Sequence, residues 1–267
     1  MSRERQSQLP LELTEAGYDE LAARLRALCA SGKAPDLSAW SEGLGAVKGS
    51  DTALYVNRIA VLDYLVASLT GELALREIAA CALNVIGAAG VTCSIVGGRA
   101  GCAGEGASLD ADVEALKAAG AKRILTLCPE SAKNLGERLK GVEVVSLDEY
   151  MLGLVASTKP ERTLKVAHPP GYSPPKLPGV EWLALSTPVH EHGPFVFRLN
   201  PPARLAYTRA LVEANSIGAD YIICACPAEF LQIKLLQREG AWRLSRVEPV
   251  TITGLACLLP GGGEDGR

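Results

Sequence analysis

Short apolar runs alternate with longer amphipathic stretches along most of this chain. From about residue 50 onward, short segments rich in apolar residues are followed by stretches in which apolar positions recur every three or four residues. The first pattern is typical of buried strands and the second of amphipathic helices. Strands that alternate with helices of this length predict an α/β fold with parallel sheets and right-handed crossovers.

The predicted strands and helices fall into two sets. In the first set, the pattern predicts strands at 53–57, 91–96, 123–128 and 142–146, and helices at 73–88, 109–119, 131–139 and 147–155. In the second set, it predicts strands at 164–168, 182–185, 219–224 and 244–247, and helices at 201–214 and 229–236. We expect Pro249 to end the last of these strands. Residues 251–259 are ambiguous by pattern alone.

Two segments of the chain repeat each other at an offset of 98 residues. Gly120–Ser131 reads GAKRILTLCPES, and Gly218–Glu229 reads GADYIICACPAE. Each copy has Gly-Ala at a helix end, an apolar strand, and then Cys-Pro. The repeat predicts two Rossmann-like parallel-sheet units related by a pseudo-twofold axis, with Cys128 and Cys226 where such sheets bind ligands. It also favours a helix at 251–259, because the corresponding strand of the first copy is followed by a helix.

These patterns divide the chain into four parts. We expect residues 1–50 to form a helical N-terminal appendage and linker, with one helix over about 14–30. Residues 51–158 form the first α/β unit and residues 159–260 the second. The stretch 169–178 is rich in proline and is predicted to be a loop. The glycine-rich tail at 261–267 is expected to be disordered.

Composition excludes several classes of protein. The 267 residues are 48% hydrophobic with a formal net charge of −3, which is no electrostatic footprint for nucleic acid or an anionic membrane. No apolar run approaches the roughly 20 residues of a spanning helix. The first residues are polar and unlike a secretory signal. We therefore expect a cytoplasmic protein that neither binds nucleic acid nor inserts into a membrane.

Eight cysteines need an explanation in such a compartment. Because they are expected to be reduced there, metal binding, redox chemistry or simple burial remain. Four of them lie in helical, strand or apolar terminal patterns and are interpreted as structural: Cys29, Cys81, Cys93 and Cys257.

Cys128 and Cys226 each stand where a strand gives way to a helix. The positive end of a helix dipole lowers the pKa of a thiol, which suits metal or redox chemistry. The alternative interpretation is a turn with a buried cysteine. The loop Gly97–Gly106 also lies between a strand and a helix, where glycine-rich loops can cradle phosphates. It has neither a Walker lysine nor a G-x-G-x-x-G pattern, so its nucleotide signal is weak.

Together these motifs resemble a known family. Strand, Cys-Pro and helix, preceded by the Gly-Cys-x-Gly-Glu run Gly101–Glu105, look like the duplicated cysteine-rich (CCG) domain. That domain occurs in heterodisulfide reductase catalytic subunits, lactate-utilisation proteins and glycolate-oxidase iron–sulfur subunits. The resemblance spans about residues 52–259. It implies that each copy binds an iron–sulfur cluster, or a metal such as zinc, through an early Cys, a Cys-Cys-Gly and a Cys-Pro-x-Cys.

This sequence departs from the family pattern at most ligand positions. Only Cys102, Cys128 and Cys226 match it. In the first copy, the early cysteine would fall near Asn57, and the last cysteine of Cys-Pro-x-Cys is Ser131. Iron–sulfur clusters generally need about four thiolates, so a complete cluster is not expected. We expect Cys102 and Cys128 to lie close together as a vestigial thiol pair.

All three histidines of the chain lie in the second copy. His168, His190 and His192 stand at or beside ligand positions of the resembled family, and Cys226 should face the same crevice. One cysteine with two or three histidines is an acceptable tetrahedral set for zinc. The alternative is that these polar residues are remnants of a decayed site.

Three functional hypotheses follow. The first is a degenerate heterodisulfide-reductase-like subunit, a non-catalytic or altered component of an electron-transfer oxidoreductase complex, with iron–sulfur or flavin redox subunits as partners. The second is a metal-dependent enzyme or sensor that uses the Cys/His site of the second unit. The third is an iron–sulfur oxidoreductase like the parent family.

Overall fold

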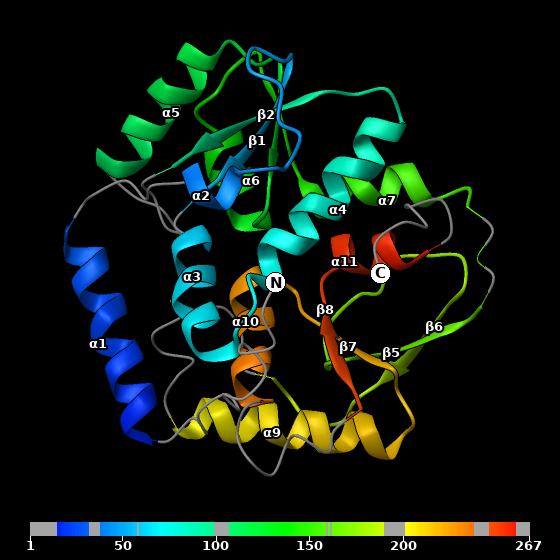
Figure 1. Ribbon diagram of the computed structural model, residues 1–267. Coiled ribbons are helices and arrows are strands. Elements are labelled where there is room, and N and C mark those ends of the chain that lie inside the picture. The colour runs from blue at the N-terminus through cyan, green and yellow to red at the C-terminus, as the bar shows by residue number, and fades with distance from the viewer. Residues whose placement is uncertain are drawn as a thin grey trace, which may run out of the picture.

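The chain folds into two four-stranded parallel sheets with helices around and between them (Figure 1). A computed structural model describes residues 15–31, 38–57, 59–98, 107–158, 160, 162–189, 201–237 and 246–259. The predicted α/β fold with two Rossmann-like units is confirmed. We call residues 51–158 unit 1 and residues 159–260 unit 2.

The sheet of unit 1 has the strand order β2-β1-β3-β4. Its strands are β1 (Thr52–Val56), β2 (Cys93–Gly97), β3 (Arg123–Thr126) and β4 (Glu143–Ser146). Its helices are α3 (Ile59–Thr70), α4 (Ala74–Ala88), α5 (Ala107–Ala119), α6 (Pro129–Gly136) and α7 (Leu147–Val155). Side chains alternate across β1, because Ala53 and Tyr55 join the core under α5 and α6, whereas Leu54 and Val56 face the main core.

The sheet of unit 2 has the order β6-β5-β7-β8, which matches unit 1 strand for strand. Its strands are β5 (Leu164–His168), β6 (Val180–Ala184), β7 (Tyr221–Ile223) and β8 (Glu248–Val250). Its helices are α9 (Pro201–Ser216), α10 (Pro227–Leu236) and α11 (Ile252–Leu258). The proline-rich residues between β5 and β6 form a loop, as predicted, and contain no helix between 169 and 179.

The repeated segments occupy equivalent places in the two units. Cys128 is the N-cap residue of α6 and Cys226 that of α10, and each is followed by proline at the start of the helix. The preceding helices end at Gly120 and Gly218, whose φ angles of 70° and 74° lie in the left-handed region that glycine adopts without strain. The prediction that the two cysteines stand at equivalent strand ends is therefore confirmed. The helix favoured by the repeat at 251–259 is α11.

Two predicted features of the strand and helix pattern were wrong. The last strand was predicted at 244–247, but β8 begins at Glu248 and contains Pro249. Proline is tolerated because β8 lies at the edge of its sheet. Its bonds to neighbouring residues use the Glu248 N–H and the Val250 carbonyl, so the Pro249 nitrogen is not needed. Helix α3 was not predicted, because apolar residues occupy most of its faces and hide the helical period.

Helices between the sheets join the two units. α3, α4, α10 and α11 lie in the middle of the molecule (Figure 1), where α3 packs on α10, and both α4 and α7 pack on α11. One continuous core includes buried residues from both units. It also includes Tyr18 and Leu21 of α1 (Glu15–Ser31) and Trp40 of α2 (Ser38–Ser41). The two N-terminal helices are thus packed on the core.

A buried carboxylate links α2, α3 and α4. Asp63 is completely buried and accepts hydrogen bonds from Trp40 Nε1 (3.1 Å), the Leu75 N–H (3.1 Å) and the Arg76 N–H (2.9 Å). Burial raises the pKa of Asp63, and these hydrogen bonds partly offset the effect. Because Asp63 satisfies two free N–H groups at the start of α4, its role is structural.

None of the helices in the described part of the chain is both long enough and apolar enough to cross a bilayer.

Candidate functional site

The carboxyl ends of the two sheets meet at the junction of the units. Asp148 lies in the first turn of α7, after β4, and Thr253 lies in the first turn of α11, after β8. Asp148 Oδ1 accepts hydrogen bonds from the Thr253 N–H (2.7 Å) and hydroxyl (2.6 Å). These residues are 105 positions apart, as are the N-cap residues Ser146 and Thr251. Equivalent positions that contact each other indicate a pseudo-twofold axis here.

Acidic groups surround a tyrosine at this junction. Tyr172 comes from the proline-rich loop of unit 2. Its pKa is raised, first by burial and then by the acidic groups of Asp148, Cys224 and Glu229. Burial also raises the pKa of Asp148, against the two hydrogen bonds from Thr253. The junction therefore favours protonated acids and is poorly suited to binding an anion.

Three rings form an aromatic cluster at the carboxyl end of β5. The His168 ring centroid lies 6.0 Å from that of Tyr172 and 6.3 Å from that of Trp182. Trp182 Nε1 donates to the Pro175 carbonyl at 3.1 Å, which fixes the loop against the sheet. His168 Nδ1 lies 3.1 Å from the Pro169 carbonyl. Because a carbonyl only accepts, this contact places the proton of a neutral ring on Nδ1 and leaves a lone pair on Nε2.

Cys226 follows β7, the strand that pairs with β5, and is partly exposed. Its backbone is extended, and its thiol lies at the positive end of α10. Glu229, in the first turn of the same helix, is buried, and its Oε2 accepts from the Ala225 N–H at 2.6 Å. Cys224 is fully buried. Cys226 is thus the more accessible of the two thiols at this strand end.

The equivalent edge of unit 1 is closed. Cys128 is only 2% exposed. Beside it, Asn57 at the end of β1 donates from Nδ2 to the Ser131 hydroxyl at 2.9 Å, and Asn57 Oδ1 accepts from the Ile59 N–H at 2.9 Å. These contacts span the gap between β1 and β3, the topological switch point at which open α/β sheets bind ligands.

The structure describes half of the predicted site residues. Cys128, Cys226 and His168 lie at carboxyl ends of strands, as expected. Cys102, His190 and His192 lie outside the described residues. The predicted approach of Cys102 to Cys128, and of the two further histidines to Cys226, therefore stay predictions. Among the residues that can be described, no group of three or more His, Cys, Asp or Glu side chains could hold a metal ion.

Sequence reasoning missed the residues of the junction itself. The contact of Asp148 with Thr253 could have been found by extending the repeat, because Ser146 and Thr251 are both hydroxyl residues that cap the helix after the last strand. Tyr172 carried no signal, because the proline-rich loop that holds it has no counterpart in unit 1.

Packing against Tyr55 explains why residue 98, near the start of the glycine-rich loop, is glycine. A Cβ atom on Gly98 would lie 2.3 Å from the ring and hydroxyl of Tyr55. That hydroxyl donates to Asp112 Oδ2 at 2.6 Å, and both side chains are buried. Gly98 is therefore required by the tyrosine beneath it, without any bound phosphate. The rest of the loop, 99–106, lies outside the described residues.

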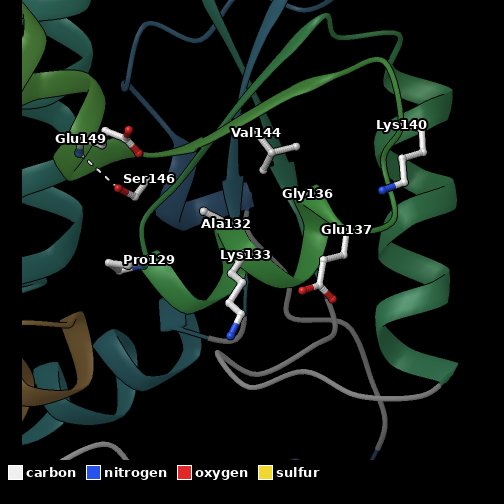
Figure 2. A pocket seen from close by; sticks show the side chains of 9 residues that line it. All are labelled: Pro129, Ala132, Lys133, Gly136, Glu137, Lys140, Val144, Ser146 and Glu149. Carbon is white, nitrogen blue, oxygen red and sulfur yellow. Dashed lines mark hydrogen bonds between the residues drawn. The ribbon is translucent and has the colours of Figure 1, made fainter.

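An open hollow of about 490 Å³ lies along α6, on the side of unit 1 that faces β4 and α7 (Figure 2). Pro129, next to Cys128, lines one end, and Ser146 lines it at the start of α7. Two lysines and two glutamates also line it: Lys133, Lys140, Glu137 and Glu149. The charged side chains that line the hollow are thus of both signs.

Comparisons with known proteins give limited similarity. No protein-family model matches this chain, and no curated protein matches it. It is similar to the solved structure of a hypothetical protein from Helicobacter pylori, with 12% identity and a TM-score of 0.46 over 95% of this chain and 59% of that one. It is also similar to a glutamate racemase isoform from Bacillus anthracis, with 15% identity and a TM-score of 0.36 over 79% and 80% of the two chains. The chain thus spans about three fifths of the Helicobacter protein.

Proposed function

We propose that this protein is a degenerate heterodisulfide-reductase-like subunit, a component of an electron-transfer oxidoreductase complex that lacks a complete iron–sulfur cluster of its own. Its partners are iron–sulfur or flavin redox subunits. The proposal rests on the resemblance of its two Cys-Pro motifs to the CCG domain and on the state of the ligand positions in unit 1.

The contact between Asn57 and Ser131 is the observation that carries this proposal. In the resembled family, the position near Asn57 and the position of Ser131 both hold cysteines that bind the cluster. Here the two side chains are buried and joined by a hydrogen bond of 2.9 Å, next to the buried Cys128. This proximity supports the interpretation of the two positions as former ligands of one cluster. Here a hydrogen-bonded pair of polar side chains stands in place of the two cysteines. This supports a unit that has retained the fold but lost the cluster.

Restoring the missing thiols tests this assignment. In a double variant, Asn57→Cys with Ser131→Cys, unit 1 would have four cysteines at family ligand positions, together with Cys102 and Cys128. After anaerobic reconstitution with iron and sulfide, the variant should gain visible absorption and labile sulfide, whereas the natural chain should gain neither. The control variant, Asn57→Ala with Ser131→Ala, loses the hydrogen bond without adding thiols and should stay colourless.

Three outcomes separate the hypotheses. A folded Cys/Cys variant that takes up no iron would contradict the ligand assignment. Stoichiometric iron and sulfide in the natural chain would instead support an oxidoreductase like the parent family. To test the partners, the natural chain should be isolated anaerobically from its own cells. Redox subunits that carry iron–sulfur clusters or flavin in stoichiometric amounts are expected, and isolation without any such subunit would overturn the proposal.

A zinc site in unit 2 is the second candidate, and His168 favours it. A metal-binding histidine usually donates its other ring N–H to a carbonyl or carboxylate, which orients the ring. His168 has this arrangement, with Nδ1 against the Pro169 carbonyl. Cys226, at another strand end of the same rim, supplies a partly exposed thiol. Both residues could contribute to a tetrahedral site together with His190 or His192.

Zinc titration of the reduced full chain against a chromophoric chelator tests this candidate. One equivalent should bind tightly, and Cys226→Ser and His168→Ala should each weaken binding by at least tenfold. Cys257→Ser, in α11 and outside the predicted ligand set, should bind as the natural chain does. Equal zinc affinity in all four proteins would exclude a site at Cys226 and His168.

A further inference from the structure

Two cysteines from different units lie near each other where α4 packs on α11. Cys81 belongs to α4 of unit 1 and Cys257 to α11 of unit 2. Their thiols are close enough for each to shift the pKa of the other, and both are only partly buried. No sequence pattern indicated this proximity, since the residues lie far apart in the chain and both were interpreted as structural cysteines.

The packing of the two helices brings these thiols together. α4 and α11 pack against each other, and Gly254 faces Ile78, since a Cβ atom there would lie 3.7 Å from Ile78 Cδ1. Cys81 and Cys257 each follow one helical turn after these residues, on the same faces of their helices. Gly254 allows the close approach of the two helices, and each thiol, one turn further along its own helix, is near enough to influence the other.

We propose that Cys81 and Cys257 form a reversible disulfide that locks unit 1 to unit 2, with a small disulfide compound such as oxidised glutathione as the oxidant. This inference does not depend on the proposed electron-transfer function. The disulfide would fix α11, whose first turn carries Thr253 against Asp148, relative to α4. Oxidation would thereby hold the carboxyl ends of the two sheets in one arrangement.

The chemistry balances as two thiol–disulfide exchanges. The Cys81 thiolate attacks one sulfur of oxidised glutathione, which gives a mixed disulfide and releases one glutathione thiolate. Cys257 then loses its proton, and its sulfur attacks Sγ of Cys81, which releases the second glutathione. Two protein thiols are oxidised and one glutathione disulfide is reduced to two thiols. Reduced glutathione in excess reverses both steps.

The environment assigns the order of these steps. The hydrogen bond from Cys257 lowers the pKa of Cys81, although burial acts in the opposite direction. The same hydrogen bond raises the pKa of Cys257, as does its burial. Cys81 is therefore the attacking thiolate and Cys257 the resolving thiol. In contrast, burial raises the pKa of Cys93 to about 11, which makes it a poor competitor.

Peptide mapping of the full chain tests this disulfide. The reduced protein is incubated with oxidised glutathione, quenched with acid, alkylated and digested with trypsin. Cleavage after Arg76 and Arg99 yields the fragment 77–99, which holds both Cys81 and Cys93, and cleavage after Arg246 yields 247–267, which holds Cys257. We expect these two fragments to be joined, with fragmentation spectra that assign the bond to Cys81.

Variants and stability provide the controls. The disulfide should vanish in Cys81→Ser and in Cys257→Ser, and it should persist in Cys226→Ser. Closing so long a loop should raise the melting temperature of the natural chain by about 5–10 °C on oxidation, and that of neither crosslink variant. Fragments that stay separate in the natural chain, or a bond that uses Cys93, would overturn the proposal. Either serine variant suffices for the comparison if the other does not fold.

Discussion

Unit 1 and unit 2 share one sheet order but connect their first two strands differently. In unit 1, β1 reaches β2 through α3 and α4, which pack on α10 and α11 of the other unit. In unit 2, β5 reaches β6 through the loop at 169–179, which brings Tyr172 to the junction. One unit thus supplies helical cover, and the other presents aromatic and polar side chains. The side chains at the carboxyl end of each sheet therefore depend more on the connection between its first two strands than on the sheet itself.

The paired cysteines show the same difference. Cys128 and Cys226 are the N-cap residues of equivalent helices. Cys128 is nevertheless buried, with only 2% of its surface exposed, whereas Cys226 is partly exposed. Beside them, Ser131 bonds to Asn57 in unit 1, while Glu229, at the position equivalent to Ser131, folds back onto the Ala225 N–H in unit 2. The two Cys-Pro motifs therefore share a backbone arrangement, but their neighbouring side chains create different environments for the two thiols.

The largest expected effect comes from breaking the helical crossover that only unit 1 has. Asp63→Ala removes the acceptor of three hydrogen bonds, from Trp40 and from the Leu75 and Arg76 N–H groups. Leaving these donors unpaired should lower the free energy of unfolding by about 3 kcal/mol. Urea unfolding followed by tryptophan fluorescence measures this.

Asp110→Ala is the matched control for that variant. Asp110 forms an exposed ion pair with Arg138, whose loss should cost about 0.5 kcal/mol or less. If the two variants were equally stable, the crossover would not be held together by Asp63, and the contrast between the units would need another basis.

A smaller loss is expected where the glycine-rich loop of unit 1 leaves β2. In Gly98→Ala, the new methyl group would overlap the Tyr55 ring, so Tyr55 must move away from Asp112. We expect the free energy of unfolding to fall by about 2 kcal/mol. In Gly153→Ala, an exposed position in α7 with no atom near the new methyl group, stability should be unchanged or rise by up to about 1 kcal/mol. Thermal and urea unfolding of both variants would show whether the overlap matters.

Thiol labelling can sharpen the contrast between the two Cys-Pro motifs. In the folded, reduced protein, Cys226 should react with iodoacetamide at least about tenfold faster than Cys128, because reaction needs access to the thiolate. Mass spectrometry of the two cysteine-containing peptides over time measures both rates. In urea the two rates should converge. A Cys128 that reacts as fast as Cys226 before unfolding would mean that unit 1 is not closed.

The repeat explains how much of this fold could be predicted from the sequence. Strand order cannot be read from a pattern, but two copies of strand, Cys-Pro and helix were enough to predict two similar parallel sheets. Two predictions failed because a local signal was misleading. Pro249 was expected to end the last strand but lies within β8, at the edge of its sheet. Helix α3 was not predicted because it is apolar on most faces, which hides its helical period. Contacts between the units, such as Asp148 with Thr253 or Cys81 with Cys257, depend on tertiary packing and left no local pattern.

The smallest expected effect tests the position that differs between the units at the pseudo-twofold axis, Asp148 in unit 1 and Thr253 in unit 2. Burial raises the pKa of Asp148 above its ordinary 3.8, so the folded protein holds this proton to a higher pH than the unfolded chain. Its contribution to stability is complete below pH 3.8 and is lost as pH rises through the raised pKa. Asp148→Asn cannot ionise but keeps an oxygen for both Thr253 bonds. The variant should therefore gain about 1 kcal/mol relative to the natural chain between pH 4 and pH 7. Urea unfolding at several pH values measures that gain.

Thr253→Val, which removes only one hydrogen bond, should instead lose about 1 kcal/mol at neutral pH. A constant difference between Asp148→Asn and the natural chain at every pH would show that no buried charge lies at the axis.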